Sequence, residues 1–253
     1  MATILVTGAN RGIGFAIVQA IGNRLPDSTV LLGCRTFKAG NDAIEQLKSS
    51  GVSANLQALA LDIEDDSSIA AAADVVRERF GHLDGYGQML IAKVLINNAI
   101  KIELSSSTNA EERRQASNRS FNNGITSNTQ VTREFLPLLE KSNWPRVIMV
   151  SSSRGSFGKT VNGELPAVAV IDYCVIKAAL NMLTVHFQAQ NKGVTFWAIS
   201  PGHCKTGFNG FRGTKDPLLG AEVIMKLLES QKGEVEGGTF WEYEQDEFRA
   251  VPW

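Results

Sequence analysis

The sequence has little of several residue types and patterns that mark particular classes of protein. It contains 3 cysteines and 3 histidines in 253 residues. An odd, sparse set of cysteines excludes a disulfide framework and favours a reducing compartment, and histidines this few and widely spaced give no basis for a metal site. No apolar run is long enough to span a bilayer, and no signal peptide precedes the first apolar segment. We therefore expect a cytoplasmic protein with no metal and no membrane partner.

The chain also lacks an excess of charge of either sign. Its 25 basic and 26 acidic residues give a formal net charge of −1, so neither a nucleic-acid partner nor an anionic membrane surface is expected. The composition, 43% hydrophobic and 20% charged, suits a compact protein. Because the chain shows no internal repeat and no linker, we expect a single domain over residues 1–253.

What is present is an alternation of short apolar runs and amphipathic segments. Runs typical of buried strands lie at residues 3–8, 28–35, 55–63, 93–99, 146–153, 194–200 and 238–244. Helical spacing is found between them, at about residues 10–25, 41–51, 65–81 and 172–190 and in a long segment ending near residue 142. This alternation predicts an α/β fold, a Rossmann-type doubly wound domain with a seven-stranded parallel sheet flanked by helices.

A glycine cluster joins the first expected strand to the first expected helix. The segment TGANRGIG supplies Gly8, Gly12 and Gly14. Glycines in this place allow a tight turn, close approach of a pyrophosphate, and contact between helix and strand. The helix N-terminus adds free N–H groups and the positive end of its dipole. A glycine cluster alone is weak support, but strand before and helix after are the context that a dinucleotide site requires.

Two arginines favour NADP(H) over NAD(H). An NAD site usually has an acid at the end of the second strand, which binds the ribose hydroxyls. Here that strand ends in Arg35, and Arg11 lies inside the glycine loop. Guanidinium groups bind a 2′-phosphate through bidentate, charge-assisted hydrogen bonds. The alternative, that Arg35 is only a solvated strand end, stays open.

A tyrosine and a lysine lie four residues apart in DYCVIKAALNML, on one face of the expected helix. These are Tyr173 and Lys177. A phenol has a pKa of about 10, and a nearby ammonium lowers it, so that the phenol can work as a general acid or base. The serines of VSSSRG end the fifth expected strand, at the sheet edge where doubly wound folds bind their ligands.

The segments TGANRGIG, LDI, NNA, SSSRG, YCVIK and SPG occur in the order typical of one family. The chain resembles the classical short-chain dehydrogenase/reductase family over nearly its whole length, in particular fungal NADPH-dependent carbonyl reductases and ketoreductases. The resemblance implies that Tyr173 is the acid/base and that Lys177 lowers its pKa and binds the nicotinamide ribose. Counting back three residues from Gly155 makes Ser152 the active serine, with Ser151 and Ser153 as the alternatives.

The same resemblance implies which residues hold the NADP(H). Those in or near the phosphate-binding region are Gly8, Asn10, Arg11, Gly12, Ile13, Gly14 and Arg35. Those beside the adenine and its ribose are Asp62, Ile63, Asn98 and Ala99. Those around the nicotinamide are Tyr173, Lys177, Pro201, Gly202, Cys204 and Thr206. Cys204 is interpreted as standing in for a small apolar residue and not as a redox group.

The chain departs from the family pattern at three places. Ile100 stands where the family has a glycine beside the cofactor cleft, and residues 85–93 form an apparent loop insertion. Gly124 aligns with an asparagine that holds a water for proton relay in the family. Asn123 is one residue away, about 100° around a helix, and could replace it only if the helix were kinked or shifted. Our hypothesis is that Gly124→Asn and Ile100→Gly raise turnover.

Residues 202–221 follow the sixth strand and are expected to form a substrate lid. Their aromatic content points to a bulky, apolar or aromatic substrate. The residues expected to line its pocket are Phe157, His203, Phe208 and Phe211. The aromatic side chains fit equally well as packing within the lid.

The function that these features predict is NADPH-dependent reduction of a ketone or aldehyde to an alcohol. One alternative is an enzyme of the same fold that uses bound NADP(H) for a non-redox cyclisation or isomerisation. The other is a non-catalytic NADP-binding protein, because fold alone does not decide function. The resemblance also implies a homodimer or homotetramer, since the family assembles through its fourth and fifth helices.

Overall fold

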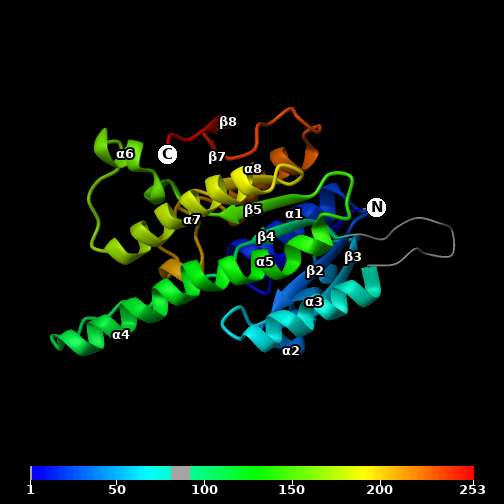
Figure 1. Ribbon diagram of the computed structural model, residues 1–253, viewed down its shortest axis with the longest axis horizontal. Coiled ribbons are helices and arrows are strands. Elements are labelled where there is room, and N and C mark those ends of the chain that lie inside the picture. Colours follow the sequence, from blue (N-terminus) through cyan, green and yellow to red (C-terminus); the bar gives the residue numbers. More distant parts are fainter. Residues whose placement is uncertain (1, 81–91) are drawn as a thin grey trace.

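The computed structural model describes residues 2–80 and 92–253. Its central sheet has the strand order β3-β2-β1-β4-β5-β6-β7-β8 (Figure 1). The strands are β1 (Thr3–Thr7), β2 (Thr29–Cys34), β3 (Asn55–Ala60), β4 (Ala92–Asn97), β5 (Arg146–Val150), β6 (Thr195–Ser200), β7 (Thr239–Glu244) and β8 (Glu247–Ala250). The helices are α1 (Gly12–Arg24), α2 (Phe37–Ser49), α3 (Asp66–Phe80), α4 (Ala110–Phe121), α5 (Asn128–Leu139), α6 (Phe157–Val161), α7 (Ile171–Gln190) and α8 (Pro217–Glu229).

The fold class is confirmed, and the number of strands is corrected. Strands β1 to β7 pair in parallel, as expected, but β8 adds an eighth strand antiparallel to β7. A two-residue turn joins them, in which Gln245 and Asp246 have positive φ of 54° and 60°. Positive φ at both turn residues gives the twist that a tight hairpin needs, but Asn-Gly or Asp-Gly is the usual sequence. Because the sequence has neither pair at these positions, the hairpin was not predicted.

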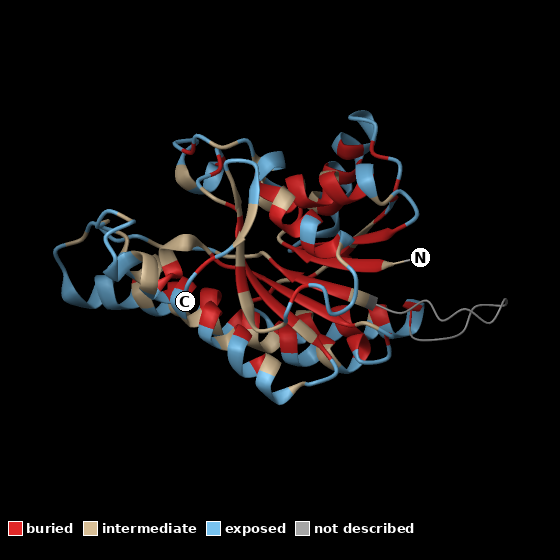
Figure 2. Cartoon of the chain, turned by 90° about the horizontal axis from the view of Figure 1, so that it is seen from above, coloured by how far each residue is buried: buried red, intermediate tan, exposed pale blue. Residues whose placement is uncertain are grey.

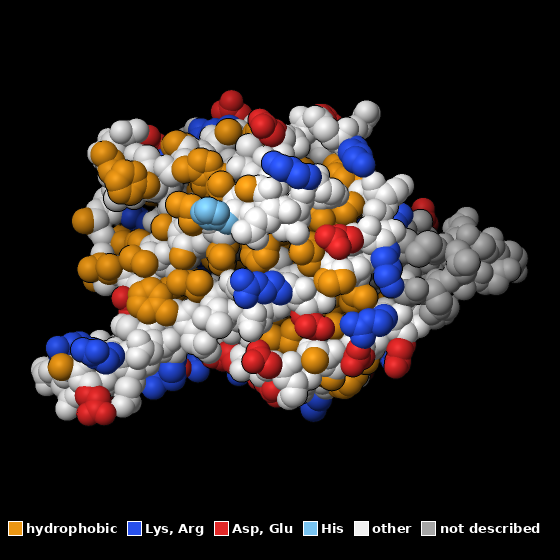
Figure 3. All heavy atoms as spheres, in the orientation of Figure 1, with side chains coloured by type: hydrophobic (Ala, Val, Ile, Leu, Met, Phe, Trp, Pro, Cys, Tyr) orange, Lys and Arg blue, Asp and Glu red, His pale blue; other side chains and the backbone are white. Residues whose placement is uncertain are grey.

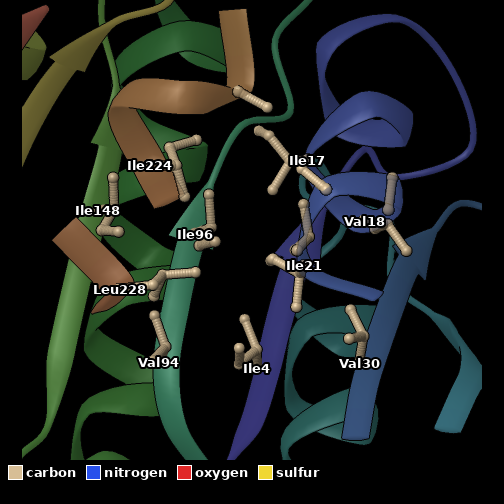
Figure 4. Close-up of a cluster of buried hydrophobic side chains, with 14 of the residues drawn as sticks. Ile4, Ile17, Val18, Ile21, Val30, Val94, Ile96, Ile148, Ile224 and Leu228 are labelled. Atoms are coloured by element: carbon tan, nitrogen blue, oxygen red, sulfur yellow. The ribbon is translucent and has the colours of Figure 1, made fainter. Parts of the chain in front are cut away.

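Alternate residues of each strand enter two separate apolar layers. On β1, Ile4 and Val6 face the layer beneath α1, α2 and α8, while Leu5 faces the layer beneath α3, α5 and α7. Figure 4 shows the first layer, where side chains of α1 and α8 meet those of β1, β4 and β5. Strands buried on both faces carry continuous apolar runs. The strands therefore lie between two helical layers whose outer faces are exposed (Figure 2).

The strand order places the loops of the site on one edge. β1 lies between β2 and β4, so the chain reverses its direction of progress across the sheet there, and ligands of doubly wound folds bind at such a switch point. The residues that follow β1, β4, β5 and β6 all lie at the carboxyl edge. Of the expected insertion, Ala92 and Lys93 belong to β4, and residues 85–91 lie outside the described residues. No helix within residues 2–80 and 92–253 is both long and apolar enough to cross a membrane.

Candidate active site

The phosphate loop between β1 and α1 is built from close backbone contacts. Gly8 and Gly12 have φ of 64° and 58°, a region that costs glycine little. A Cβ on Gly14 would lie 2.3 Å from the carbonyl oxygen of Gly8, so no side chain fits there. The α1 N-cap, Arg11, makes no side-chain cap hydrogen bond, which leaves the first N–H groups of the helix for a ligand. These features fit the pyrophosphate of a dinucleotide.

Asn98 fastens this loop to the neighbouring strand. Its Nδ2 donates to the carbonyl oxygen of Thr7 at 2.8 Å, and its own N–H donates to Thr7 Oγ1 at 3.0 Å. A Cβ on Gly8 would lie 3.0 Å from the Cα of Ala99. Both residues expected beside the adenosine ribose therefore lie against the phosphate loop, and the Asn98 amide supports the loop directly.

The arginine expected at the 2′-phosphate follows β2 directly. Arg35 and Arg11 are both exposed. Thr36 caps α2 by accepting a hydrogen bond from the N–H of Ala39 at 3.2 Å. Arg35 thus projects from the junction of a strand end and a helix N-terminus, where an anion is favoured. Asp62 lies one strand further out and accepts from the N–H of Glu64 at 3.1 Å, and the neighbouring Ile63 is buried.

Ser152 and Tyr173 meet at the carboxyl end of β5. Ser152 has extended φ and ψ of −164° and 148°, and its side chain accepts from the N–H of Arg154. Burial raises the pKa of the Tyr173 phenol, and a hydrogen bond with Ser152 and the positive charge of Arg154 act in the opposite direction. The structure therefore places the predicted serine within reach of the predicted tyrosine.

Lys177 lies one turn beyond Tyr173 on α7 and is buried. Its Nζ donates to the carbonyl oxygen of Val150 at 2.6 Å and lies 5.7 Å from the centre of the Tyr173 ring. Burial lowers the pKa of Lys177 to about 7. The Ser151 hydroxyl donates to the carbonyl oxygen of Lys177 at 3.0 Å, which ties the serine segment to α7. This hydrogen bond gives Ser151, one of the two alternative serines, a structural partner within α7.

A π-helix interrupts the long helix at the position of the missing asparagine. It spans Asn122–Ser127, between α4 and α5. A π turn holds one residue more than an α turn, which supplies the shift that Asn123 needs. Asn123 is 4% exposed, and its Oδ1 accepts from the N–H of Lys101 at 2.6 Å. Asn123 is thereby fixed beside the segment that follows β4, next to Ile100.

Gly124 instead packs against α7. A Cβ on Gly124 would lie 2.4 Å from Cγ2 of Ile176, and Ile176 is fully buried. The Asn128 amide also donates to the carbonyl oxygen of Gly124 at 3.0 Å, which links the π-helix to α5. An asparagine at position 124 would therefore collide with α7, contrary to our hypothesis that it would improve the site.

The segment after β6 crosses over the phosphate loop. A Cβ on Gly12 would lie 3.7 Å from the Cβ of Thr206, and Thr206 is buried. Cys204 is also buried, its Sγ donates to the carbonyl oxygen of Pro201 at 3.2 Å, and burial raises its pKa to about 11. A thiol held neutral in this way behaves as a small apolar group. Residues 217–221 of the expected lid belong to α8.

Of the four expected substrate-binding residues, Phe208 lies against Tyr173, the predicted catalytic tyrosine. The centres of the Phe208 and Tyr173 rings are 5.9 Å apart. Phe157 is 75% exposed at the start of α6, and Phe211 is 64% exposed. His203 is exposed, and its carbonyl oxygen accepts from the N–H groups of Thr214 and Lys215. The structure thus brings one of the four into contact with the predicted catalytic group.

A buried acid behind the serine segment was missed in the sequence. Glu242 on β7 is 2% exposed and accepts from Ser153 Oγ at 2.8 Å. It shares a strand face with the buried Phe240, two residues earlier. An acid in the core-facing register of an expected strand was the signal available in the sequence, because such a group must be paired.

The model of the short chain dehydrogenase family matches residues 2–216. The chain is a member of this family. A short-chain dehydrogenase/reductase of Aspergillus fumigatus is 36% identical over 263 residues, which cover 99% of this chain and 97% of the relative. Another, from a Phoma species, is 30% identical over 261 residues, 91% of each chain.

Solved structures share the fold of this short-chain dehydrogenase. NADPH-bound carbonyl reductase from chicken fatty liver superposes with a TM-score of 0.78 at 24% identity, covering 100% of this chain and 99% of that one. Salutaridine reductase from Papaver somniferum gives a TM-score of 0.77 at 22% identity, covering 95% and 99%. Membership of the family makes this chain an oxidoreductase that acts on alcohol or carbonyl groups with a nicotinamide cofactor.

Proposed function

We propose that this chain is an NADP(H)-dependent reductase of ketones or aldehydes. The observation that carries the proposal is the approach of Ser152 to Tyr173, with Lys177 one helical turn away and its Nζ 5.7 Å from the centre of the tyrosine ring. The pair lies at the carboxyl edge, beside the loop that fits a pyrophosphate. A bound nicotinamide would supply the hydride, and the protein has to orient the carbonyl group and provide a proton.

The three residues divide this work. Ser152 donates a hydrogen bond to the carbonyl oxygen of the substrate, and Tyr173 gives that oxygen a proton as the hydride arrives. With the cofactor bound, a charged Lys177 favours the phenolate that remains on Tyr173. Asn123, fixed in the π-helix, replaces the family asparagine in the supply of protons by way of water. Changing Tyr173 to phenylalanine keeps the ring and removes the proton donor.

The test is NADPH consumption with a panel of aromatic and bicyclic ketones. Tyr173→Phe is expected to lower kcat by at least about 100-fold, the usual contribution of a general acid. Turnover that survives in Tyr173→Phe would remove the assigned mechanism. Tight NADPH binding with no turnover on any ketone would instead favour the non-redox enzyme or the non-catalytic NADP-binding protein.

The choice of NADP(H) rests on Arg35. Its guanidinium at the end of β2 is exposed, and Arg11 projects from the phosphate loop, so both are free to pair with a 2′-phosphate. We expect Arg35→Ser to weaken NADPH binding about tenfold and to leave NADH binding unchanged, since one charge-assisted contact contributes ~1.5 kcal/mol or more. Lys38→Ala is the matched control, because Lys38 is exposed in the first turn of α2, the helix that follows Arg35, and pairs with Asp42 at 2.7 Å.

The substrate class follows from the aromatic group beside Tyr173. Phe208 is 56% exposed although its ring lies 5.9 Å from the tyrosine ring. An aromatic or bulky apolar ketone would cover this exposed face, which gives the substrate a favourable place to bury its own rings. We propose that residues 202–216 act as the substrate lid, and that the chain works as one NADP-binding domain.

We propose that the chain forms a homodimer or homotetramer through α7. Its outer face carries an apolar stripe that includes Ile171, Val175, Met182 and Val185, all exposed. Figure 3 shows apolar side chains gathered over this helix, beside the projecting α4. Apolar patches of this kind mark association surfaces. Met182→Asp is expected to convert the oligomer to monomers in light scattering, while Leu219→Asp on α8, also at an exposed apolar position, is expected to leave it intact.

A further inference from the structure

The carboxylate of Glu242 joins three separate segments behind the catalytic serine. Its Oε2 accepts from Ser153 Oγ at 2.8 Å, and its Oε1 accepts from Lys159 Nζ at 2.6 Å and from Arg249 Nε at 2.9 Å. Burial alone would raise the pKa of Glu242, but the hydrogen bonds from Lys159, Ser153 and Arg249 outweigh it and lower the pKa. The group is therefore an acceptor-only carboxylate at neutral pH.

The charge on Glu242 fixes the direction of a hydrogen-bond chain. Ser153 Oγ lies 2.9 Å from Ser200 Oγ. Each hydroxyl has one proton, so Ser153 donates to the carboxylate and Ser200 donates to Ser153. The Ser200 oxygen then accepts from the N–H groups of Ser153 at 2.9 Å and Gly202 at 3.4 Å. In this arrangement each serine hydroxyl donates one hydrogen bond and accepts at least one, and the arrangement requires Glu242 to accept the hydrogen bond from Ser153.

Two residues of this hydrogen-bond network, Ser153 and Gly202, adjoin the proposed active site. Ser153 is the direct neighbour of Ser152 and begins the short helical turn that Ser152 caps. Gly202 lies in the segment expected beside the nicotinamide and has φ of 83°. Because Ser153 points back into the sheet toward Glu242, the backbone between the two serines holds the Ser152 hydroxyl toward Tyr173. A misplacement of about 1 Å at such a group can cost ~100-fold in rate.

We propose that Glu242 is a positioning residue for carbonyl reduction, acting through Ser153 and Ser200 on the Ser152 hydroxyl and on Gly202. The proposal rests on the proposed function, which assigns Ser152 to the carbonyl oxygen. Lys159 and Arg249 keep the buried carboxylate charged, since an unpaired buried charge would be neutralised. Glu242 touches neither substrate nor cofactor.

Glu244 is the matched control on the same strand. It lies two residues beyond Glu242, on the same face of β7, and pairs with Lys215 at 3.1 Å. Lys215 belongs to the base of the proposed lid, where its carbonyl oxygen accepts from the N–H of Lys205 at 2.9 Å. Glu242 therefore holds the serine segment, whereas the Glu244 carboxylate lies against Lys215 and Gly202 at the base of the proposed lid.

The first test compares Glu242→Gln, Ser153→Ala, their double variant and Glu244→Gln in NADPH-dependent ketone reduction. A glutamine must turn its NH2 either toward Lys159 and Arg249 or toward Ser153, and each orientation breaks the chain. We expect Glu242→Gln and Ser153→Ala each to lower kcat about tenfold, with the KM for NADPH unchanged. The double variant is expected to lose no more, because both changes break one link. Additive losses in the double variant would overturn the proposal, and Glu244→Gln shows how far kcat changes when an acid of the same strand is lost at the lid.

The second test needs no turnover and separates this proposal from the proposed function. Amide hydrogen exchange of the free protein is expected to speed up in residues 151–160 of Glu242→Gln, with residues 3–24 unchanged. If the wild type reduces no ketone, the proposed function fails and the exchange measurement still decides the role of Glu242. Unchanged exchange in residues 151–160 would refute that role. If Glu242→Gln does not fold, Ser153→Ala serves in both measurements with the same expected results. This variant keeps the Glu242 carboxylate and its ion pairs with Lys159 and Arg249.

Discussion

The two sides of the carboxyl edge are built in different ways. The phosphate loop uses consecutive residues and backbone contacts, as in the approach of Gly14 to the Gly8 carbonyl. The catalytic side uses side chains brought from β5, β6, β7 and α7, as in the chain from Ser200 through Ser153 to Glu242. The first leaves no room for a side chain at Gly14, and the second joins residues from several strands. The phosphate loop is thus fixed within the first 100 residues, by its own backbone contacts and by Asn98, whereas the serine segment depends on strands from the end of the chain.

The largest effect should come from adding a methyl group to the phosphate loop. In Gly14→Ala the Cβ would lie 2.3 Å from the Gly8 carbonyl oxygen and 2.5 Å from Asn98 Nδ2, so backbone must move. A shift that costs about 3 kcal/mol would weaken NADPH binding ~100-fold, as measured by fluorescence titration. Gly193→Ala, where nothing lies within 4 Å, should bind NADPH as the wild type does. Equal affinity in the two variants would contradict the tight packing of the loop.

A second substitution applies the same steric test to the catalytic side. Gly124→Asn should lower the free energy of unfolding by about 1–3 kcal/mol and reduce turnover, because its Cβ would lie 2.4 Å from Ile176 Cγ2. Thermal unfolding and ketone reduction measure the two effects. Ile100→Gly is still expected to raise turnover. A faster Gly124→Asn enzyme would restore the original hypothesis for that position.

The buried lysine should make stability depend on pH in the cofactor-free protein. Burial lowers the pKa of Lys177 from 10.5 to about 7, so above pH 7 the unfolded chain binds more protons than the folded one. The free energy of unfolding therefore rises between pH 7 and pH 9, by up to about 2 kcal/mol. This pH range ends at 9.0, the ordinary pKa of a thiol. Burial raises the pKa of Cys34 to about 11, so above pH 9 this thiol lowers the free energy of unfolding as the pH rises.

The control for this pH dependence is Lys177→Met, which removes the titrating group. Its denaturation curves should change less between pH 7 and pH 9 than those of the wild type. An identical slope in the two proteins would show that Lys177 does not titrate in this range.

The smallest effect is expected on the substrate side. Phe208→Ala should raise the KM for an aromatic ketone several-fold, in line with about 0.5–1.5 kcal/mol for an aromatic contact, and leave the KM for NADPH unchanged. Phe157→Ala should change neither, because Phe157 is 75% exposed and lies outside the contact with Tyr173. Steady-state kinetics of both variants with one aromatic ketone measures these KM values. A larger effect of Phe157→Ala would move the substrate pocket toward α6.

The same contrast explains what the sequence could predict. The parallel strands and the phosphate loop follow from local patterns, so β1 to β7 and the glycines were predictable. The β7–β8 hairpin was not, because Gln245 and Asp246 adopt positive φ without a glycine. The hydrogen bond between Ser153 and Glu242 joins residues 89 positions apart, a separation at which one sequence holds no pairing information. The π-helix was not predicted: a kinked or shifted helix was stated only as the condition under which Asn123 could replace the family asparagine.

The added hairpin also bears on the order in which the protein matures during synthesis. Glu242 keeps its charge with the help of Arg249 from β8, and the carbonyl oxygen of Trp253 accepts a hydrogen bond from the N–H of Gly158 in α6. Residues 8–14, by contrast, are supported by β1, α1 and the amide of Asn98, all within the first 100 residues. A growing chain can therefore shape its phosphate loop early, but the serine segment reaches its final geometry only after β8 has left the ribosome.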